Sequence, residues 1–161
     1  MIEIRKATPA DDSQIWEIIR QVIAKGDTYV FDPASPREKM LDFWCGKGKH
    51  TYVATVDGKV AGTFLLKDNQ PDLGKHIANG AYMVSPDAGG LGIGKAMGEF
   101  SIEEAKRLGY KAMQFNFVIK SNERAVRLWE KLGFNIIGEI PEAFDHQQNG
   151  LTNAYIMYRK L

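Results

Sequence analysis

Hydrophobic and polar positions divide the chain into segments of two kinds. In some, apolar and polar residues alternate, which is typical of strands; in others, apolar residues recur at helical spacing. Turn residues separate the segments, such as Asp57-Gly58 between two strands and Gly133 after a helix. In chain order the pattern predicts a strand over residues 2–7, helices over 9–24 and 35–46, strands over 51–56, 59–66 and 76–84, a helix over 91–108, a strand over 112–119, a helix over 121–132, and strands over 135–140 and 152–160.

This order, βααβββαβαββ, predicts an α/β fold of the α+β type, in which helices flank a mixed, mostly antiparallel seven-stranded sheet. Ser35-Pro36-Arg37-Glu38 matches a capping box and is expected to begin the second helix. Phe144 and His146 fall in a predicted polar loop between the last two strands. Glu104 lies on the apolar arc of the helix over residues 91–108, and the pattern gives no reason for it.

Composition and charge restrict the class of protein. The 161 residues are 44% apolar and 25% charged, so residues 1–161 are expected to form a single domain with an adequate core. The single cysteine, Cys45, cannot pair within the chain or supply a zinc site. With 21 basic and 20 acidic residues, bulk charge favours neither nucleic acid nor a membrane as a partner. No apolar run reaches the length of about 18 residues that spans a bilayer, and a cytoplasmic protein is expected.

Four glycines stand within six residues where the strand over residues 76–84 gives way to a helix: Gly89, Gly90, Gly92 and Gly94. Glycine lets the backbone approach a ligand closely, and the start of a helix adds unpaired N–H donors and the positive end of its dipole. The segment therefore indicates a site for a phosphate or pyrophosphate. A glycine-rich turn that serves packing alone is the alternative.

Two nucleotide-binding motifs fit this segment poorly. Gly89, Gly94 and Lys95 imitate a P-loop, but Ala96 stands where a magnesium-binding Ser or Thr is required. In the dinucleotide fingerprint that starts at Gly90, Lys95 replaces the third glycine, and no acid lies near residue 110. Both nucleotide interpretations are therefore minor alternatives.

Together with the glycines, a later segment that runs from Asn122 to Phe134 resembles the GCN5-related N-acetyltransferase (GNAT) family. In that family a strand, a Q/R-x-x-G-x-G/A loop and a helix hold the pyrophosphate of acetyl-CoA, and a later N-x-x-A-x-x-x-Y-x-x-x-G-F segment closes the thiol side. Residues 89–94 correspond to the Q/R-x-x-G-x-G/A loop. The later family segment corresponds to Asn122, Ala125, Trp129, Gly133 and Phe134. The resemblance extends over the whole chain and implies the acyl-CoA N-acyltransferase fold, with acetyl-CoA as co-substrate and no metal.

The resemblance also implies which residues contact acetyl-CoA. Backbone groups of Met83 and Val84 would bind the pantetheine arm and the thioester, and an N–H there would support the developing oxyanion. Asn122 would either cap its helix or bind the pantetheine arm, and both interpretations remain open. The complete implied set is Met83, Val84, Gly89, Gly90, Leu91, Gly92, Ile93, Gly94, Lys95, Asn122, Ala125 and Trp129.

Two positions depart from the family pattern. Gly89 replaces the usual Gln or Arg, which removes a charge-assisted phosphate contact worth about 1.5–3 kcal/mol. Trp129 replaces the tyrosine commonly proposed to protonate the departing thiolate, and an indole is no useful acid near neutrality. A thiol with a pKa near about 8.5 leaves tolerably as the thiolate, so either no acid is needed or a tyrosine such as Tyr82 or Tyr155 takes its place.

The implied mechanism is direct attack of a neutral amine on the thioester in a ternary complex, without an acyl-enzyme. Met83, Tyr82 and Asn116 are the residues expected to take part in it. Residues 76–82 contain no carboxylate, so the sequence identifies no general base, although Asn79 or Tyr82 would be able to position a water.

Residues around Asn116 resemble a narrower branch of the family, which includes fungal acetyltransferases that act on proline analogues such as azetidine-2-carboxylate. This resemblance implies a small-molecule amine acceptor that Asn116 contacts; the alternative is that Asn116 satisfies buried backbone. By analogy with the fold, Tyr29, Phe31, Phe144 and His146 are expected at the acceptor rim, although a lone loop histidine is more often solvated.

Two further interpretations remain. Because of Trp129, an acyl-CoA-binding sensor or interaction module with a degenerate active site is the alternative function, ahead of a P-loop-like nucleotide binder. The apolar strand over residues 154–158 would suit a homodimer, but core burial explains it equally well.

Overall fold

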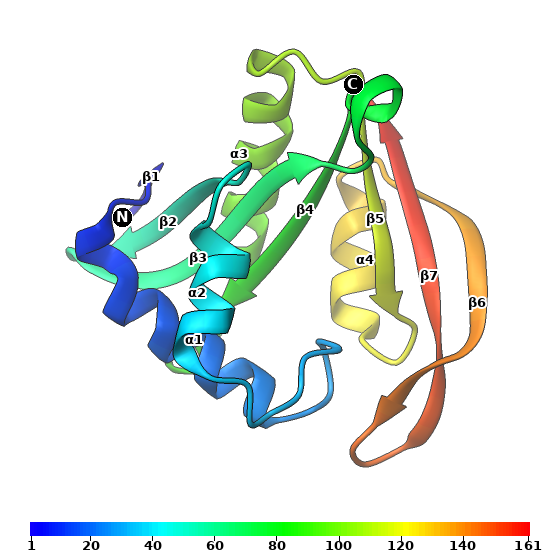
Figure 1. Ribbon diagram of the computed structural model, residues 1–161, viewed down its shortest axis with the longest axis horizontal. Coiled ribbons are helices and arrows are strands. Elements are labelled where there is room, and N and C mark those ends of the chain that lie inside the picture. Colours follow the sequence, from blue (N-terminus) through cyan, green and yellow to red (C-terminus); the bar gives the residue numbers. More distant parts are fainter.

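Seven strands form one twisted sheet with helices on both of its faces (Figure 1). The computed structural model describes residues 1–161. The strands are β1 (Ile2–Lys6), β2 (His50–Val56), β3 (Lys59–Asp68), β4 (Ile77–Val84), β5 (Ala112–Ile119), β6 (Asn135–His146) and β7 (Gly150–Lys160). They lie side by side in the order β1-β2-β3-β4-β5-β7-β6, and every neighbouring pair is antiparallel except β4 and β5. The predicted fold class and element order are confirmed.

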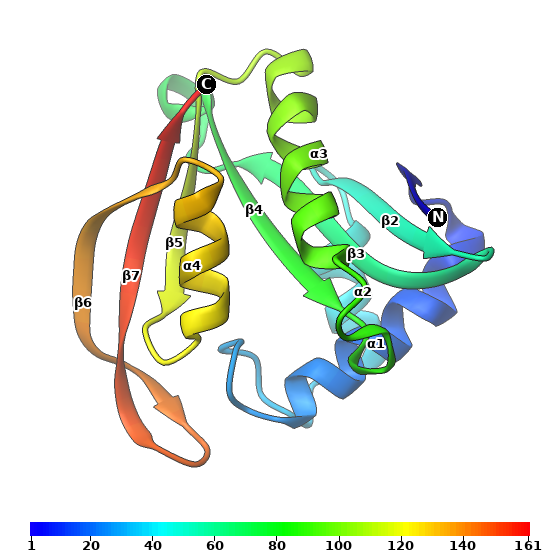
Figure 2. The same cartoon turned by 180° about the vertical axis from the view of Figure 1, so that it is seen from behind.

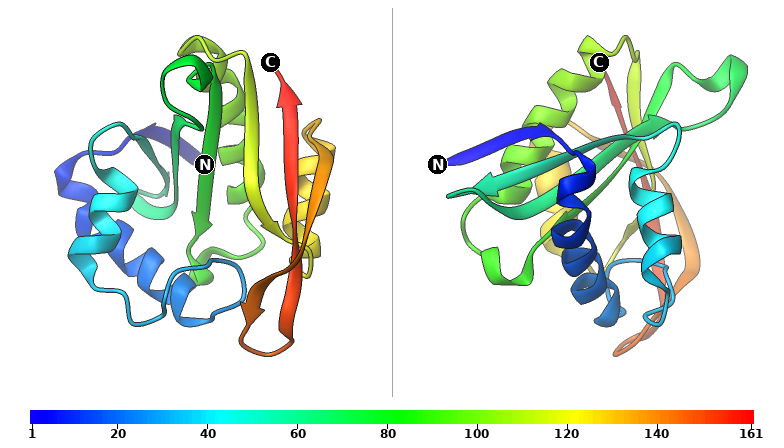
Figure 3. Two further views of the ribbon diagram at one scale, coloured as in Figure 1. Left: turned by 45° about the vertical axis from the view of Figure 1, so that its right-hand side comes forward. Right: turned by 60° about the vertical axis from the view of Figure 1, so that its left-hand side comes forward.

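Four α helices cover the two faces of the sheet (Figures 2 and 3). They are α1 (Asp12–Ala24), α2 (Arg37–Cys45), α3 (Ile93–Arg107) and α4 (Glu123–Lys131). A core between the sheet and α1 and α2 contains Ile15, Trp44 and Met83. A second core under α3 and α4 contains Met97 and Trp129. None of these helices has both the length and the apolar character needed to cross a membrane.

The sheet opens between β4 and β5. These strands pair only at their first residues, where Ile77 lies opposite Ala112 and Ala78 opposite Met113. At the point of separation, Asn79 Nδ2 donates to the carbonyl oxygen of Gln114 at 3.0 Å. Beyond it the strands diverge toward their carboxyl ends, and the connection between α1 and α2 lies near the wide end of the opening (Figure 1). The space between the diverging strands is called the gap below.

The last hairpin is longer than predicted. The prediction of a polar loop at Phe144 and His146 is wrong, because β6 continues to His146 and pairs with β7 there. The register shifts between Ile140 and Phe144, and Glu142 has a positive φ of 49°. This irregularity interrupts the alternation of apolar and polar residues, so the pattern placed the end of the strand too early.

Helix starts also differ in detail. The capping box predicted at Ser35 is wrong: α2 starts at Arg37, and Ser35 Oγ donates to the carbonyl oxygen of Asp32 at 2.6 Å. Glu104 lies on the apolar arc of α3 because its carboxylate accepts a hydrogen bond from the Tyr52 hydroxyl at 2.8 Å and pairs with Arg107. The partly buried carboxylate of Glu104 therefore has its hydrogen-bonding partners.

Candidate functional site

The glycine-rich turn between β4 and α3 presents unpaired backbone N–H groups to open space. Gly90 and Gly92 have φ values of +79° and +76°, which side chains rarely adopt. The first backbone donor of the helix is Ala96, whose N–H reaches the carbonyl oxygen of Gly92 at 3.0 Å. The N–H groups of the three preceding residues therefore have no acceptor within the helix. A Cβ atom added at Gly89, Gly90 or Gly92 would meet nothing within 4 Å, so the turn has room for a ligand.

Close packing of α3 against α4 fixes the position of this turn. A Cβ atom at Gly98 of α3 would lie 2.6 Å from Leu132 Cδ1 and 3.2 Å from Trp129 Cζ3, so a larger residue here would displace these side chains. The first turns of both helices lie on either side of the wide end of the gap (Figure 2). At the start of α4, Asn122 Oδ1 accepts from the N–H of Ala125 at 3.4 Å, whereas its Nδ2 donates to no group of the chain. Asn122 thus caps α4 and keeps a free donor.

One edge of β4 lacks a strand partner along the gap. Ser85 donates its N–H to Ala61 of β3 at 2.8 Å, and Met83 lies opposite Thr63 of β3. Backbone groups of successive strand residues point to opposite edges, so those of Met83 point toward β3 and those of Gly80, Tyr82 and Val84 point into the gap. This register corrects the expectation for Met83, which is buried: of the two residues predicted to contact the ligand through their backbone, Val84 alone faces the gap.

An aromatic cluster lies under the turn, on the side of α3 and α4. The Trp129 ring is 4.7 Å from that of Tyr82 and 4.5 Å from that of Phe115, and its side chain is only 7% exposed. The Tyr82 hydroxyl shares a 2.7 Å hydrogen bond with Ser101 Oγ, and burial raises the pKa of Tyr82 well above its ordinary value. The Tyr82 hydroxyl therefore stays protonated, and the Tyr82 side chain lines the gap on the side of α3 and α4.

Tyr29, from the connection between α1 and α2, enters the gap from the other side. Its hydroxyl donates to the carbonyl oxygen of Tyr82 at 2.7 Å and accepts from the N–H of Tyr82 at 2.9 Å. The ring stacks on Phe31 at 6.2 Å, and Phe31 packs edge-on against Phe43 of α2 at 4.9 Å. Of the residues predicted for the acceptor rim, Tyr29 thus directly contacts β4.

Side-chain amides gather on the same side, where the two strands separate. Gln114 Nε2 donates to Asn116 Oδ1 at 2.9 Å, and Asn116 Nδ2 donates to Asn69 Oδ1 at 2.7 Å. Asn79 reaches the backbone of Gln114, and its cross-strand neighbour in β3 is Lys67. Sequence reasoning missed Asn69, Gln114 and Lys67, although the spacing of Gln114 and Asn116 by two along one strand places them on one face.

Lys67 gives this amide group a partly buried cation. Its Nζ lies 5.0 Å from the centre of the Phe43 ring. Burial, and then the charge of Lys49, lower the pKa of Lys67. This cation lies beside the apolar aromatic surface on the side of α1 and α2. A positively charged side chain there suits an anionic group of a ligand better than a second cation.

The hairpin of β6 and β7 borders the wide end of the gap. Phe144 and His146 are 6% and 9% exposed, which corrects the expectation of a solvated loop. His146 Nδ1 accepts from the N–H groups of Gln148 and Asn149, both at 3.1 Å. Gln147 donates its N–H to the carbonyl oxygen of Gly26 at 3.1 Å and joins the hairpin to the connection that carries Tyr29.

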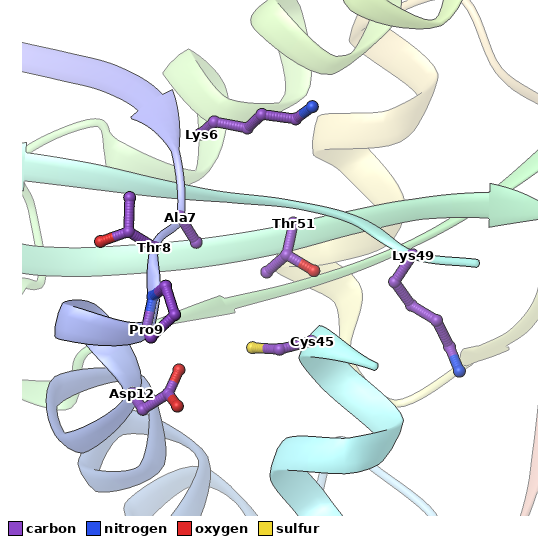
Figure 4. Close-up of a pocket in the computed structure, with 8 residues that line it drawn as sticks. All are labelled: Lys6, Ala7, Thr8, Pro9, Asp12, Cys45, Lys49 and Thr51. Carbon is purple, nitrogen blue, oxygen red and sulfur yellow. The ribbon is translucent and has the colours of Figure 1, made fainter. Parts of the chain in front are cut away.

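Two cavities lie away from the gap. One of about 250 Å³ is bordered by Lys6, Thr8, Asp12, Cys45 and Lys49 (Figure 4). Burial, with the nearby charge of Asp12, raises the pKa of the Cys45 thiol to about 11, so the thiol is a poor nucleophile. A second cavity of about 400 Å³ lies near His50, His76 and Tyr110. No group of three or more His, Cys, Asp or Glu side chains in the structure is arranged to hold a metal ion.

The chain is similar to known proteins in sequence and in fold. A family model described as "Acetyltransferase (GNAT) family" matches residues 16–134. The N-acetyltransferase aca1 of Schizosaccharomyces pombe is 30% identical over 89% of this chain and 77% of its own length. A GCN5-related N-acetyltransferase structure from Kribbella flavida is 37% identical, with a TM-score of 0.94 over 99% of this chain and 98% of that one. A phosphinothricin acetyltransferase from Sinorhizobium meliloti in complex with acetyl-CoA has a TM-score of 0.87 at 24% identity over 99% of this chain and 88% of that one, a likeness of fold.

Proposed function

Because the chain belongs to the acetyltransferase (GNAT) family and is an acyltransferase with acetyl-CoA as its co-substrate, we propose that it acetylates the amine of a small molecule such as an amino acid or amino-acid analogue. The neutral amine of the acceptor attacks the thioester carbonyl directly in a ternary complex. The C–N bond forms, the C–S bond breaks to release the thiolate of coenzyme A, and the proton lost by the nitrogen passes to water. The observation that carries the proposal is the juxtaposition of the open glycine turn with the unpaired edge of β4.

The turn supplies the pyrophosphate site in this proposal. The backbone N–H groups of residues 89–95 would donate to the phosphates at the positive end of the α3 dipole, where a Cβ atom at Gly89, Gly90 or Gly92 would meet nothing within 4 Å. Lys95 is exposed, with Nζ 3.8 Å from Glu99, and is free to move toward a phosphate. The positive charge of Lys95 compensates for the charge-assisted phosphate contact that Gly89 does not supply. Leu91, Gly94 and Ala125 complete the surface along which the cofactor would lie, and the free Nδ2 of Asn122 is available to the pantetheine arm. Ile93 is 2% exposed and belongs to the core, so only its backbone N–H is proposed to contribute.

The acyl group lies along the β4 edge in this proposal. The N–H of Tyr82 points into the gap and would donate to the oxyanion that forms on the thioester carbonyl, while Val84 binds the pantetheine arm. Trp129 packs against this position and has no acidic proton, so the thiolate leaves unprotonated. Catalysis rests on proximity and on fixed backbone dipoles.

The acceptor lies on the side of α1 and α2. Its carboxylate would meet Lys67 and the amide of Asn116, and its amine would point toward β4, along a wall formed by Tyr29 and Phe31. An acceptor of this kind fits the branch that includes azetidine-2-carboxylate acetyltransferases. Phe144 and His146 close the wide end of the gap, where the β6–β7 hairpin contacts the α1–α2 connection.

The test begins with calorimetric titration of acetyl-CoA into the wild type, Gly92→Asp and Gly58→Asp. Gly92 and Gly58 have φ values of +76° and +79°, and a Cβ at either meets open space, so the two substitutions impose similar strain. Only Gly92→Asp adds a negative charge at the turn, and we expect it to weaken binding at least about 100-fold. Equal affinities for the two variants would contradict the assigned site.

Thiol release in the presence of amino acids and matched amines then tests transfer. Release that depends on an amine supports the enzyme. Saturable binding of acetyl-CoA without transfer to any amine of a broad panel would instead support the acyl-CoA sensor.

A further inference from the structure

The hydroxyl of Tyr29 occupies a position that a neighbouring strand would normally fill. The N–H and C=O of Tyr82 point into the gap, where β5 has moved away, and such buried backbone groups need partners. One oxygen atom serves both, since the Tyr29 hydroxyl donates to the carbonyl at 2.7 Å and accepts from the N–H at 2.9 Å. This is a long-range contact between the α1–α2 connection and β4.

Aromatic packing holds the Tyr29 ring in this place. It lies parallel to Phe31 at 6.2 Å with an interplanar angle of 14°, and edge-on to Trp44 at 6.4 Å. Phe31 contacts Phe43, so the group rests on α2. Burial raises the pKa of the Tyr29 hydroxyl, which therefore stays neutral and acts as both donor and acceptor.

We propose that the Tyr29 hydroxyl is a displaceable stand-in for the thioester carbonyl oxygen. It satisfies the N–H and the C=O of Tyr82 while no acyl group is present. It leaves when the acyl oxygen takes the N–H of Tyr82, and a water molecule then replaces it as the donor to the Tyr82 carbonyl. The inference rests on the proposed function, which places the acyl group along this edge of β4. The resemblance to the family does not require such a contact. The inference follows from the two hydrogen bonds between Tyr29 and Tyr82.

Release of Tyr29 has a consequence for the acceptor. The Tyr29 ring is part of the wall between the gap and the amide group around Asn116. When the hydroxyl leaves Tyr82, the wall rearranges against Phe31, and the acceptor side takes its binding shape. Acetyl-CoA is therefore expected to strengthen binding of the amine, because only the acyl group competes for the same N–H.

Tyr29→Phe removes the hydroxyl and keeps the ring. We expect the Kd of acetyl-CoA to fall at least about fivefold, because the protein no longer gives up hydrogen bonds when the acyl group binds. Adenosine 3′,5′-bisphosphate, which has neither pantetheine nor an acyl group, should bind both proteins within a factor of about two. Tyr110→Phe is the matched control: its hydroxyl bonds Asp68 at 2.7 Å, away from the gap, and its loss should leave both affinities unchanged.

A second measurement does not depend on the variant. In protein labelled with 5-fluorotryptophan, acetyl-CoA should move the 19F resonance of Trp44, which touches the Tyr29 ring, and the bisphosphate should not. Substitution of Trp44 by Phe assigns the signal. An unmoved Trp44 resonance at saturating acetyl-CoA would overturn the proposal.

The outcomes separate this inference from the function beneath it. If the wild type binds no acetyl-CoA, the proposed function fails and the stand-in role fails with it. If the wild type binds acetyl-CoA but Tyr29→Phe binds it equally or more weakly, the stand-in role alone is overturned. Weaker binding would mean that the hydroxyl instead assists the bound acyl group.

Discussion

The two walls of the gap are built from different parts of the polypeptide. On the side of α3 and α4, main-chain groups dominate: the N–H groups of the glycine turn, and the open edge of β4. On the side of α1 and α2, side chains dominate, and they come from distant segments: Tyr29, Lys67, Asn69, Asn79 and Asn116.

This difference matches the ligands that the two walls are proposed to bind. A pyrophosphate needs only donors at close range, which every backbone offers once side chains are absent. An acceptor amine is distinguished from others by its charges and shape, which only side chains can match. The main-chain wall is thus suited to the cofactor, which is the same in every reaction, and the side-chain wall to the acceptor, which is selected among amines. Three variants test this contrast, one on each wall and one where the walls meet.

The largest effect is expected on the main-chain wall, at Gly98. In Gly98→Val the new Cβ atom lies 2.6 Å from Leu132 Cδ1 and 3.2 Å from Trp129, so the Leu132 side chain and the Trp129 ring must shift. We expect overpacking to lower the free energy of unfolding by about 2–3 kcal/mol, measured by urea denaturation. Acetyl-CoA binding should weaken with it.

Gly94→Ala is the control for Gly98. Its Cβ atom would lie 3.7 Å from Leu128 and 3.8 Å from Val84, in ordinary contact. A glycine-to-alanine change inside a helix is expected to stabilise by about 0.5–1 kcal/mol. Equal stability of Gly98→Val and Gly94→Ala would show that close helix packing does not hold this wall in place.

A smaller effect is expected on the side-chain wall, at Asn116. Asn116→Ala removes the hydrogen bonds to Gln114 and Asn69 together with the proposed contact to the acceptor. We expect kcat/KM for an amino-acid acceptor to fall about tenfold, equivalent to about 1.4 kcal/mol, while the Kd of acetyl-CoA stays constant. Steady-state thiol release and calorimetry measure the two quantities.

Asn153→Ala serves as the control for Asn116. Asn153 is also a strand asparagine with side-chain hydrogen bonds, to Glu139 and Glu142, but it lies on β7 away from these amides. It should leave both quantities unchanged. A fall in acetyl-CoA affinity in Asn116→Ala, with turnover at saturation unaltered, would assign Asn116 to the other wall.

The main-chain wall was largely predictable from the sequence. Glycines at a strand-to-helix junction report a backbone conformation directly, and Gly90 and Gly92 have the positive φ that such a turn needs. The pattern also located the elements on either side. What it did not determine was the strand register, which directs the backbone of Met83 toward β3 and that of Tyr82 into the gap. Register depends on pairing with a partner strand, which no local pattern contains.

The side-chain wall was predictable only in part. Tyr29 and Asn116 were expected near the acceptor, but their partners were not, because Asn69 and Asn116 are 47 residues apart and meet only in the fold. His146 was placed in a loop because the shift between Ile140 and Phe144 hides the strand that continues to it. Interactions at long range and irregular pairing are the two physical reasons for these failures.

The smallest effect is expected where the two walls meet, at Trp129. Trp129→Tyr restores a phenol at the place where the family has its tyrosine, within the cluster that includes Tyr82 and Phe115. If the thiolate leaves without a proton, the added acid is of little use, because the thiol pKa of about 8.5 is already close to neutrality. We expect kcat to change less than about threefold, measured by thiol release between pH 6.5 and 9. Trp129→Phe separates the loss of the indole from the gain of the hydroxyl. A tenfold rise of kcat in Trp129→Tyr but not in Trp129→Phe would contradict this expectation. It would mean that protonation of the leaving group limits kcat in the natural protein. The tryptophan would then slow the chemistry while the main-chain wall still binds the cofactor.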